Sequence, residues 1–182
     1  MTAGAPPDFP TLYRSEFAYV WKTLRRLGAP ARDMEDLAHD LFVVVHRHLP
    51  EYDARRPLRP WLFGIAVRVL SDYRRTFRNS RELLDRRVGG EAREAREAID
   101  GAPSADERLA DAQARALLIT ALDELPLDRR AVLVMHDLDG VGVPEIATAL
   151  EIPLNTAYSR LRLARADLAA AVRRPRAARG GG

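Results

Sequence analysis

The chain has 182 residues, no cysteine, a net charge of +3 and a pI near 9.7. This length suits one ordinary domain or two small ones, and the lack of cysteine excludes disulfides and thiolate metal sites. Residues 1–10 lack a basic segment followed by an apolar run, and no apolar run is long enough to span a bilayer. We therefore expect a cytoplasmic protein without a secretory signal or membrane insertion.

The basic residues are almost entirely arginine, because Lys22 is the only lysine. Arginine forms bidentate pairs with phosphate and with the edge of guanine, which lysine cannot do. A chain rich in arginine and alanine also arises from a GC-rich genome. The positions of the arginines are therefore more informative than their number.

Three helices are predicted in the first part of the chain. Apolar residues recur on one helix face over 12–27, and Gly28, Ala29 and Pro30 end that helix. A second helix is expected over 31–47, with acidic residues in its first turns, where the helix dipole favours them. After a loop over 51–58, Pro60 suits the first turn of a third helix that runs to about Phe77.

The middle of the chain changes character. Residues 91–97 are charged on nearly all sides and are flanked by glycine and proline, so we interpret 79–105 as a flexible charged linker. After this segment, apolar residues again recur at helical spacing, and no segment shows the alternating pattern of a strand. The sequence predicts an all-α fold of two small helical domains. Further helices are expected over 106–125, 128–136, 144–150 and 155–172, followed by a disordered basic tail over 173–182.

The last two of these helices have the form of a helix-turn-helix. Their apolar residues make one self-consistent core, and 151–154 is too short for anything but a sharp turn. We expect Asn155 to cap the second helix. Its outward face offers hydroxyls and arginines, which suit the major groove of DNA, although a solvated arginine face is the simpler alternative. The candidate DNA-binding residues are Asn155, Thr156, Tyr158, Ser159, Arg160, Arg162 and Arg165.

Two sets of segments, taken together, resemble an extracytoplasmic-function sigma factor of bacterial RNA polymerase. The first set comprises 33–42, 59–66 and 72–75, and the second comprises 145–147 and 155–165. The resemblance implies that 11–78 is a region 2-like domain, which binds core RNA polymerase and the −10 element. It implies that 106–172 is a region 4-like domain, which contains the helix-turn-helix and binds the −35 element of promoter DNA.

The resemblance also assigns residues of the first domain. In the family, its second helix docks on the polymerase, and the matching residues here are Asp36, Leu37, His39, Asp40 and Phe42. The following loop and helix capture an unpaired base of the −10 element, where aromatic stacking and arginine contacts hold the opened strand. The candidates for that role are Tyr52, Arg55, Arg56, Arg68, Arg74, Arg75 and Arg78, while Trp61 is assigned mainly to the core.

The chain departs from the family pattern at four of these positions. The family usually has glutamine at His39, asparagine at Arg68, glycine at Asn155 and a basic residue at Tyr158. Arginine at position 68 is larger than asparagine and always charged, so it indicates an unusual −10 preference or a contact to phosphate alone. The promoter sequence therefore does not transfer from relatives.

Other function classes fit the sequence less well. The histidines lack metal-ligand spacing, and no phosphate loop or serine–histidine pairing appears, so we expect no enzyme, cofactor, metal site or small-molecule substrate. A stand-alone helix-turn-helix regulator is the main alternative, and a protein-binding helical adaptor is a third. The family often works with an anti-sigma factor, with which the linker is compatible. We also expect the free chain to bind duplex promoters poorly, because the linker leaves its two DNA-binding modules separate.

Overall fold

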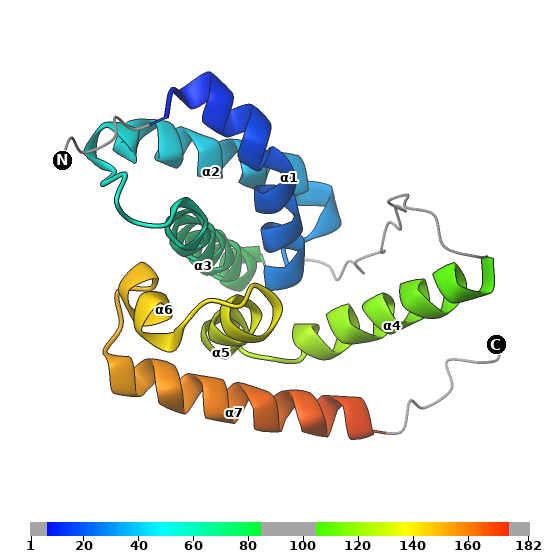
Figure 1. Cartoon of the computed structure of the whole chain (residues 1–182). Coiled ribbons are helices and arrows are strands. Elements are labelled where there is room, and N and C mark those ends of the chain that lie inside the picture. Colours follow the sequence, from blue (N-terminus) through cyan, green and yellow to red (C-terminus); the bar gives the residue numbers. More distant parts are fainter. Residues whose placement is uncertain (1–6, 85–104, 175–182) are drawn as a thin grey trace.

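The computed structural model describes residues 7–84 and 105–174, with side chains for 7–77 and 113–174. Within these ranges the chain consists of helices and loops without a strand, which confirms the all-α prediction (Figure 1). The predicted linker falls largely on 85–104, outside the described residues. The elements are α1 (Phe9–Leu27), η1 (Ala31–Asp33), α2 (Met34–His48), η2 (Leu49–Glu51), α3 (Leu58–Leu84), α4 (Ala105–Asp123), α5 (Leu127–Leu133), the π-helical turn η3 (Val134–Leu138), α6 (Val143–Ala149) and α7 (Leu154–Arg173).

Local hydrogen bonds set both ends of α1. The Asp8 carboxylate accepts a hydrogen bond from the amide of Thr11 at 3.1 Å, so the helix begins earlier than the apolar pattern predicts. At its other end Gly28 has a φ of 84°, and the amide of Ala29 donates to the carbonyl of Leu24 at 3.0 Å. This is a Schellman ending, which requires the left-handed conformation that glycine adopts most easily.

Helices α1, α2 and α3 pack against one another as the first module (Figure 1). Their apolar faces meet in a core that water does not reach. Helix α3 continues to Leu84, beyond the predicted end at Phe77, because 78–84 contains neither glycine nor proline to stop it. The buried residues of this core include Val20, Leu24, Leu37, Leu41, Val45, Phe63, Ala66 and Leu70.

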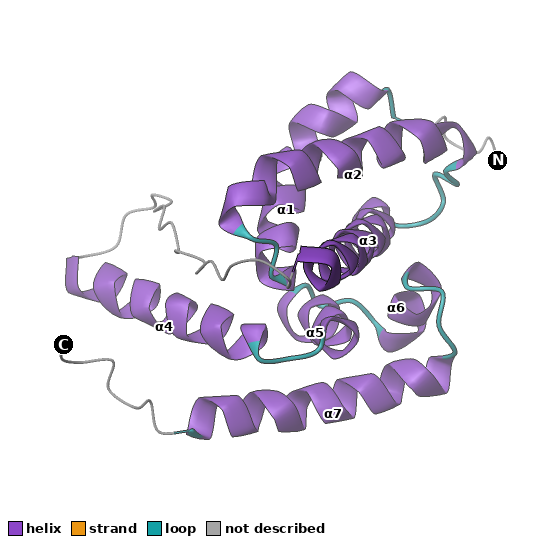
Figure 2. Cartoon of the chain, turned by 180° about the vertical axis from the view of Figure 1, so that it is seen from behind, coloured by secondary structure: helices purple, strands orange, loops and turns teal. Residues whose placement is uncertain are grey.

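Helices α4 to α7 form the second module, in which α7 lies along α5 and α6 (Figures 1 and 2). A second Schellman ending joins α6 to α7, with the amide of Ile152 donating to the carbonyl of Ala147 at 3.0 Å. Here Glu151 takes the left-handed position, with a φ of 55°. Helix α7 then begins at Leu154, after Pro153.

The predicted cap at Asn155 is wrong. Pro153 stands at the N-cap position without a side-chain cap, and its extended ψ of 143° leads directly into the helix. Asn155 therefore lies inside the first turn of α7. From there its side chain makes none of the hydrogen bonds of an N-cap residue.

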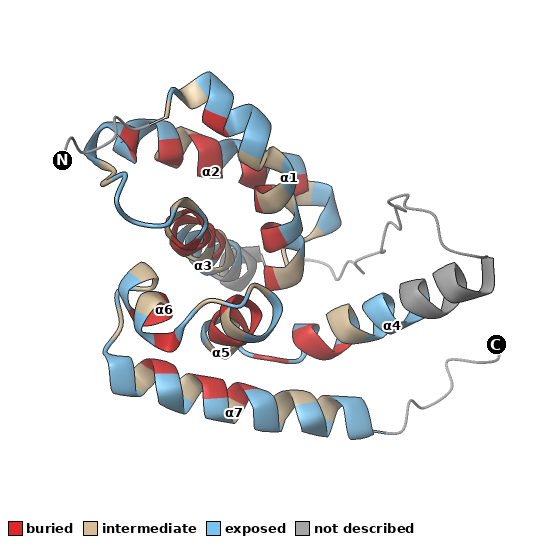
Figure 3. Ribbon diagram, viewed as in Figure 1, coloured by how far each residue is buried: buried red, intermediate tan, exposed pale blue. Residues whose placement is uncertain are grey.

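The two modules also pack against each other. Helices α5 and α6 contact α3, α4 and α5 contact α1, and the buried apolar residues of both modules join in one cluster. Figure 3 shows buried residues on the facing sides of α3, α5 and α6. The described parts of the two modules thus share one core.

Candidate functional site

Helix α7 presents the polar face that the sequence predicts. Ala157, Leu161 and Ala164 are buried against the rest of the second module. The candidate residues lie on the other side of the helix, and Tyr158 is 53% exposed. Asn155, Ser159, Arg162 and Arg165 are also exposed, while Thr156 and Arg160 are partly covered. This arrangement leaves a polar surface over 155–165, in the first half of α7, that is open to a partner.

Carboxylates hold two of the three candidate arginines on this helix. Asp137 binds Arg165 with both oxygens, at 3.0 Å from Nε and 2.6 Å from Nη2. This hydrogen bonding lowers the pKa of the Asp137 carboxyl and raises the pKa of Arg165. Arg160 pairs with Asp128 at 3.2 Å. These two guanidinium groups are therefore already neutralised within the module.

Arg162 differs from both neighbours. Its side chain has no hydrogen bond or ion pair with any residue that the structure describes. It follows Tyr158 by one helical turn, so the two side chains emerge side by side. Arg162 is thus the arginine of this face that is available to a ligand.

An aromatic pair joins the loop before α3 to the first turn of that helix. The ring centroids of Tyr52 and Trp61 lie 4.7 Å apart, and the planes of the two rings make an angle of 39°. The Tyr52 hydroxyl donates to the carbonyl of Arg56, and burial followed by the charge of Asp53 raises its pKa. Asp53 in turn holds Arg55 with bonds of 2.9 and 3.0 Å. The loop is therefore ordered around Tyr52, and the cations Arg55 and Arg56 lie at its surface.

The candidate arginines of α3 have different partners. Arg68 pairs with Glu151 of the second module at 2.5 Å, and Arg75 pairs with Asp72 at 3.0 Å. Arg74 instead donates to the carbonyls of Leu27 and Gly28 at 3.0 and 3.2 Å. Arg74 therefore caps the end of α1, where the helix dipole favours a cation. The side chain of Arg78 lies outside the described side chains.

The residues of α2 that were assigned to polymerase binding fall into an exposed group and a buried group. Asp36, His39 and Asp40 are exposed on one face, as their spacing requires. Leu37 and Phe42 are only 2% and 4% exposed and belong to the core. The exposed three are accessible to a partner, while the buried two position the helix.

An aromatic cluster beside α2 escaped the sequence analysis. Phe17 stacks on Phe42 with ring centroids 6.1 Å apart, and Tyr13 lies 4.6 Å from the same ring. The signal was present in the sequence, since aromatic residues recur every fourth position along α1. Their i,i+4 spacing places them on one face. The residues of α1 in this cluster are Phe9, Tyr13, Phe17 and Trp21.

The described residues offer no metal site, since they contain no group of three or more histidine, aspartate or glutamate side chains that could hold an ion. None of the described helices is long and apolar enough to cross a membrane. What the described surface offers is an exposed basic and aromatic loop, a polar recognition-type helix and an acidic patch.

Comparison with known proteins gives two family matches. Residues 12–80 match sigma-70 region 2, and residues 115–168 match sigma-70 region 4. The RNA polymerase sigma factor NccH of Alcaligenes xylosoxydans xylosoxydans is 30% identical over 146 residues, which cover 80% of this chain and 76% of NccH. The ECF RNA polymerase sigma factor SigL of Mycobacterium tuberculosis is 32% identical over 159 residues, covering 84% and 82%.

Two solved structures are also similar. The sigma factor RpoE from Bartonella quintana, in complex with the anti-sigma factor NepR, gives a TM-score of 0.71 at 19% identity and covers 93% of this chain and 99% of its own. CnrH in complex with the cytosolic domain of CnrY gives a TM-score of 0.57 at 26% identity, covering 89% and 85%. The first likeness shows the shared all-helical fold.

Proposed function

Because this chain belongs to the extracytoplasmic-function sigma factors, which direct RNA polymerase to promoters, we propose that its two modules divide promoter recognition between them. The region 4-like module, 106–172, reads the −35 element, and the region 2-like module, 11–78, binds polymerase and the −10 element. Core polymerase catalyses RNA synthesis, and this chain acts with it in the cytoplasm. The observation that carries this division is the exposed polar face of α7 opposite its buried alanine and leucine face.

Helix α7 enters the major groove in this proposal. The groove admits an α-helix, and arginine makes a bidentate contact to guanine there. Arg162 is assigned that contact because it has no partner among the described residues. Ser159 and Tyr158 contact neighbouring base edges or phosphates. Arg160 and Arg165, which carboxylates hold, shape the edge of this surface.

The loop and the start of α3 bind the opened −10 strand. Tyr52 and Trp61 offer aromatic faces on which an unpaired base can stack, and such stacking contributes roughly 1–3 kcal/mol per base. Arg56 lies exposed beside Tyr52 and contacts the strand's phosphates. Arg55 and Arg75 are also exposed, and they contact phosphates by exchanging the carboxylates of Asp53 and Asp72 that hold them. A base that leaves the duplex thereby regains the stacking it loses, which promotes strand opening.

Partner proteins bind other surfaces. The exposed acidic residues Asp36 and Asp40, with His39 between them, form the face of α2 that docks on core polymerase. RpoE and CnrH were solved with the anti-sigma factor NepR and with the cytosolic domain of CnrY, respectively. From its family membership, we propose that this chain also binds an anti-sigma factor. Which protein that is depends on surface residues that differ between relatives.

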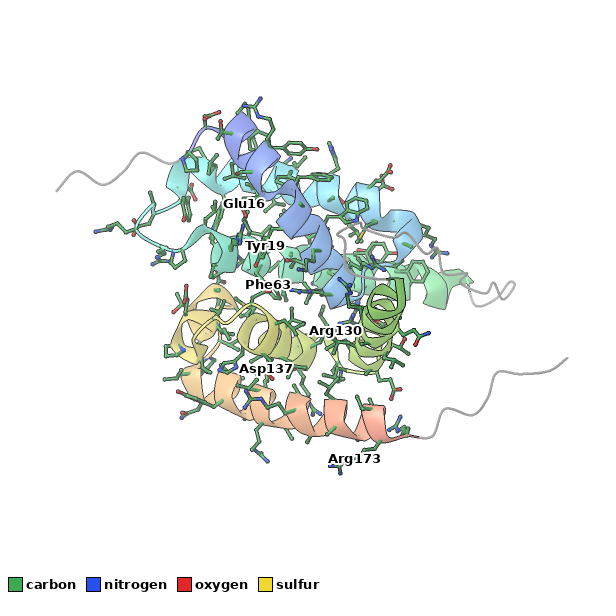
Figure 4. All side chains as sticks on the ribbon, turned by 45° about the vertical axis from the view of Figure 1, so that its right-hand side comes forward. Glu16, Tyr19, Phe63, Arg130, Asp137 and Arg173 are labelled. Atoms are coloured by element: carbon green, nitrogen blue, oxygen red, sulfur yellow. The ribbon has the colours of Figure 1, made fainter. Side chains whose placement is uncertain are left out.

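The test compares two arginines on α7. Purified chain is combined with bacterial core polymerase, and a promoter is selected from genomic fragments that the holoenzyme transcribes. Arg162→Ala should weaken binding to that promoter roughly 5- to 150-fold, the loss of one guanine contact. Arg173→Ala, an exposed arginine near the far end of the same helix, is the matched control (Figure 4). Equal effects of both changes would contradict the assignment of α7.

A further inference from the structure

Two apolar side chains lie exposed at the start of α7. Leu154 is 43% exposed and Tyr158 is 53% exposed, and one helical turn separates them, so both lie on the same face. Arg162 follows after a second turn. Tyr158 has no hydrogen bond or ring contact with any residue that the structure describes. These three residues form a stripe, the α7 stripe, that is apolar at the beginning of the helix and charged two turns later.

An open hollow adjoins the apolar end of the α7 stripe. It lies between α6 and the start of α7, two helices that pack side by side (Figure 1). Its lining residues are Pro144, Ala147, Thr148, Glu151, Ile152 and Leu154. No cation is among them, and the carboxylate of Glu151 is already paired with Arg68 at 2.5 Å. The hollow therefore suits an uncharged apolar group better than a phosphate.

The position of Leu154 on the helix connects this hollow to DNA. In a helix-turn-helix, residues near the N-terminal end of the second helix contact base edges in the major groove, and Leu154 is the first residue of α7. The C5 methyl of thymine is the apolar group that bases present there, beside hydrogen-bond donors and acceptors. A single exposed leucine elsewhere on a surface needs no ligand. Here an apolar residue stands where a base edge arrives, with Tyr158 and the hollow beside it.

We propose that Leu154, Tyr158 and the adjoining hollow form a binding site for the C5 methyl group of a thymine in the −35 element. The inference rests on the proposed function, in which α7 enters the major groove. It makes Leu154 a specificity-determining residue that the sequence analysis did not single out. The apolar end of the α7 stripe reads thymine by apolar contact, and Arg162 reads guanine by hydrogen bonds.

The length of the α7 stripe limits how far apart these two bases lie. Leu154 and Arg162 are two helical turns apart, which is about 12 Å along the helix axis at a rise of about 1.5 Å per residue. DNA rises about 3.4 Å per base pair. We therefore expect the thymine and the guanine within roughly four base pairs of each other in the −35 element.

Replacement of thymine by deoxyuridine tests the site with the unaltered chain. Deoxyuridine keeps the hydrogen-bonding groups of thymine and lacks only the C5 methyl. The holoenzyme is prepared with core polymerase, and each thymine of the −35 element, on either strand, is replaced singly in a promoter that the holoenzyme transcribes. One position should bind about fourfold more weakly, because a group of the size of one CH₂ is no longer buried. Equal affinity for every substituted promoter would overturn the proposal.

Leu154→Ala identifies the residue that contacts this methyl. The change shortens an exposed side chain, and alanine favours the helix, so α7 should remain intact. The variant should bind the thymine promoter at least about fourfold more weakly than wild type, and it should not distinguish that promoter from the deoxyuridine promoter. Leu117→Ala, which shortens a leucine that is 42% exposed on α4, is the matched control and should keep the distinction. If Leu154→Ala keeps it as well, the assignment of Leu154 is wrong.

Arg162→Ala separates this inference from the proposed function. If Arg162→Ala weakens promoter binding while no deoxyuridine substitution does, α7 still reads the −35 element and the methyl site alone is wrong. If neither change affects binding, α7 does not read the −35 element, and the proposed function and this inference both fail. Weakening by both changes, with the thymine and the guanine within the expected distance, supports both.

Discussion

Asp137 binds the guanidinium of Arg165 with both of its carboxylate oxygens, at 3.0 and 2.6 Å, from the π-helical turn that follows α5. A cation held in this way neutralises no phosphate. The bidentate pair therefore lowers the positive charge that α7 offers to DNA. It distinguishes Arg165 from Arg162 on the same helix, which has no partner among the residues that the structure describes.

Asp137→Asn should release Arg165 to the DNA backbone. We expect duplex binding by the holoenzyme to strengthen at low salt, with the slope of log K against log[salt] steeper by about one, and base preference unchanged. Binding titrations at several salt concentrations measure the slope. Glu16→Gln, which frees Arg59 in the first module, is the control for net charge. A changed base preference would show that Arg165 reads sequence after all.

The buried Arg130 predicts an asymmetric response to mutation. Arg130 is 1% exposed and its partner Asp123 is 52% exposed, with 2.6 Å between them. Asp123→Asn leaves a buried cation without its carboxylate and should lower the free energy of unfolding by about 1–3 kcal/mol. Arg130→Met leaves a half-exposed aspartate and the backbone carbonyl of Arg26 without their donor, but no buried charge, and should cost less. Urea unfolding compares the two, and the reverse order would contradict this account of the pair.

The pKa of Tyr19 predicts a loss of stability at alkaline pH. Burial, followed by the charge of Asp139, raises this pKa above the ordinary value of 10.0, so the folded chain favours the protonated hydroxyl. Its contribution is fully present below pH 10 and declines as the pH rises above 10, where the unfolded chain ionises first. Tyr19→Phe should flatten this decline. Thermal unfolding between pH 8 and 11 measures it, and an equally steep decline in the variant would exclude Tyr19 as the cause.

The two groups of residues on α2 should respond differently to truncation. Asp40→Ala removes an exposed carboxylate and should reduce co-elution with core polymerase while unfolding stays within about 0.5 kcal/mol of wild type. Leu37→Ala removes a side chain that is 2% exposed and should destabilise the fold by roughly 2–5 kcal/mol. A stable Leu37→Ala variant that loses only polymerase binding would move Leu37 to the docking surface.

Local patterns were sufficient to predict most of the fold. The apolar spacing of α1, α2 and α7 is strong, and each helix appeared near its expected place. The ends of the helices were harder to predict. Asp8 and Pro153 determine where α1 and α7 begin, and the spacing of apolar residues does not reveal those positions. The polar face of α7 was also predictable, because burial of Ala157 and Leu161 determines which side faces outward.

The partners of the candidate arginines were not predictable in the same way. Arg68 and Glu151 are 83 positions apart, and Arg165 and Asp137 are 28 apart, so their pairing depends on how helices cross. The crossing of α3 and α6 in turn depends on one missing Cβ at Gly64. Nothing in the spacing of the charges themselves encodes that approach. The match of residues 12–80 to sigma-70 region 2 also disfavours the stand-alone regulator.

Co-elution with bacterial core RNA polymerase on a sizing column, followed by transcription of genomic fragments, tests the central claim most directly. We predict a stable complex that starts transcripts at discrete sites sharing a −35 and a −10 element, none of which core alone uses. If core ignores the chain while the chain alone still binds duplex DNA, the division of promoter recognition between the two modules is wrong.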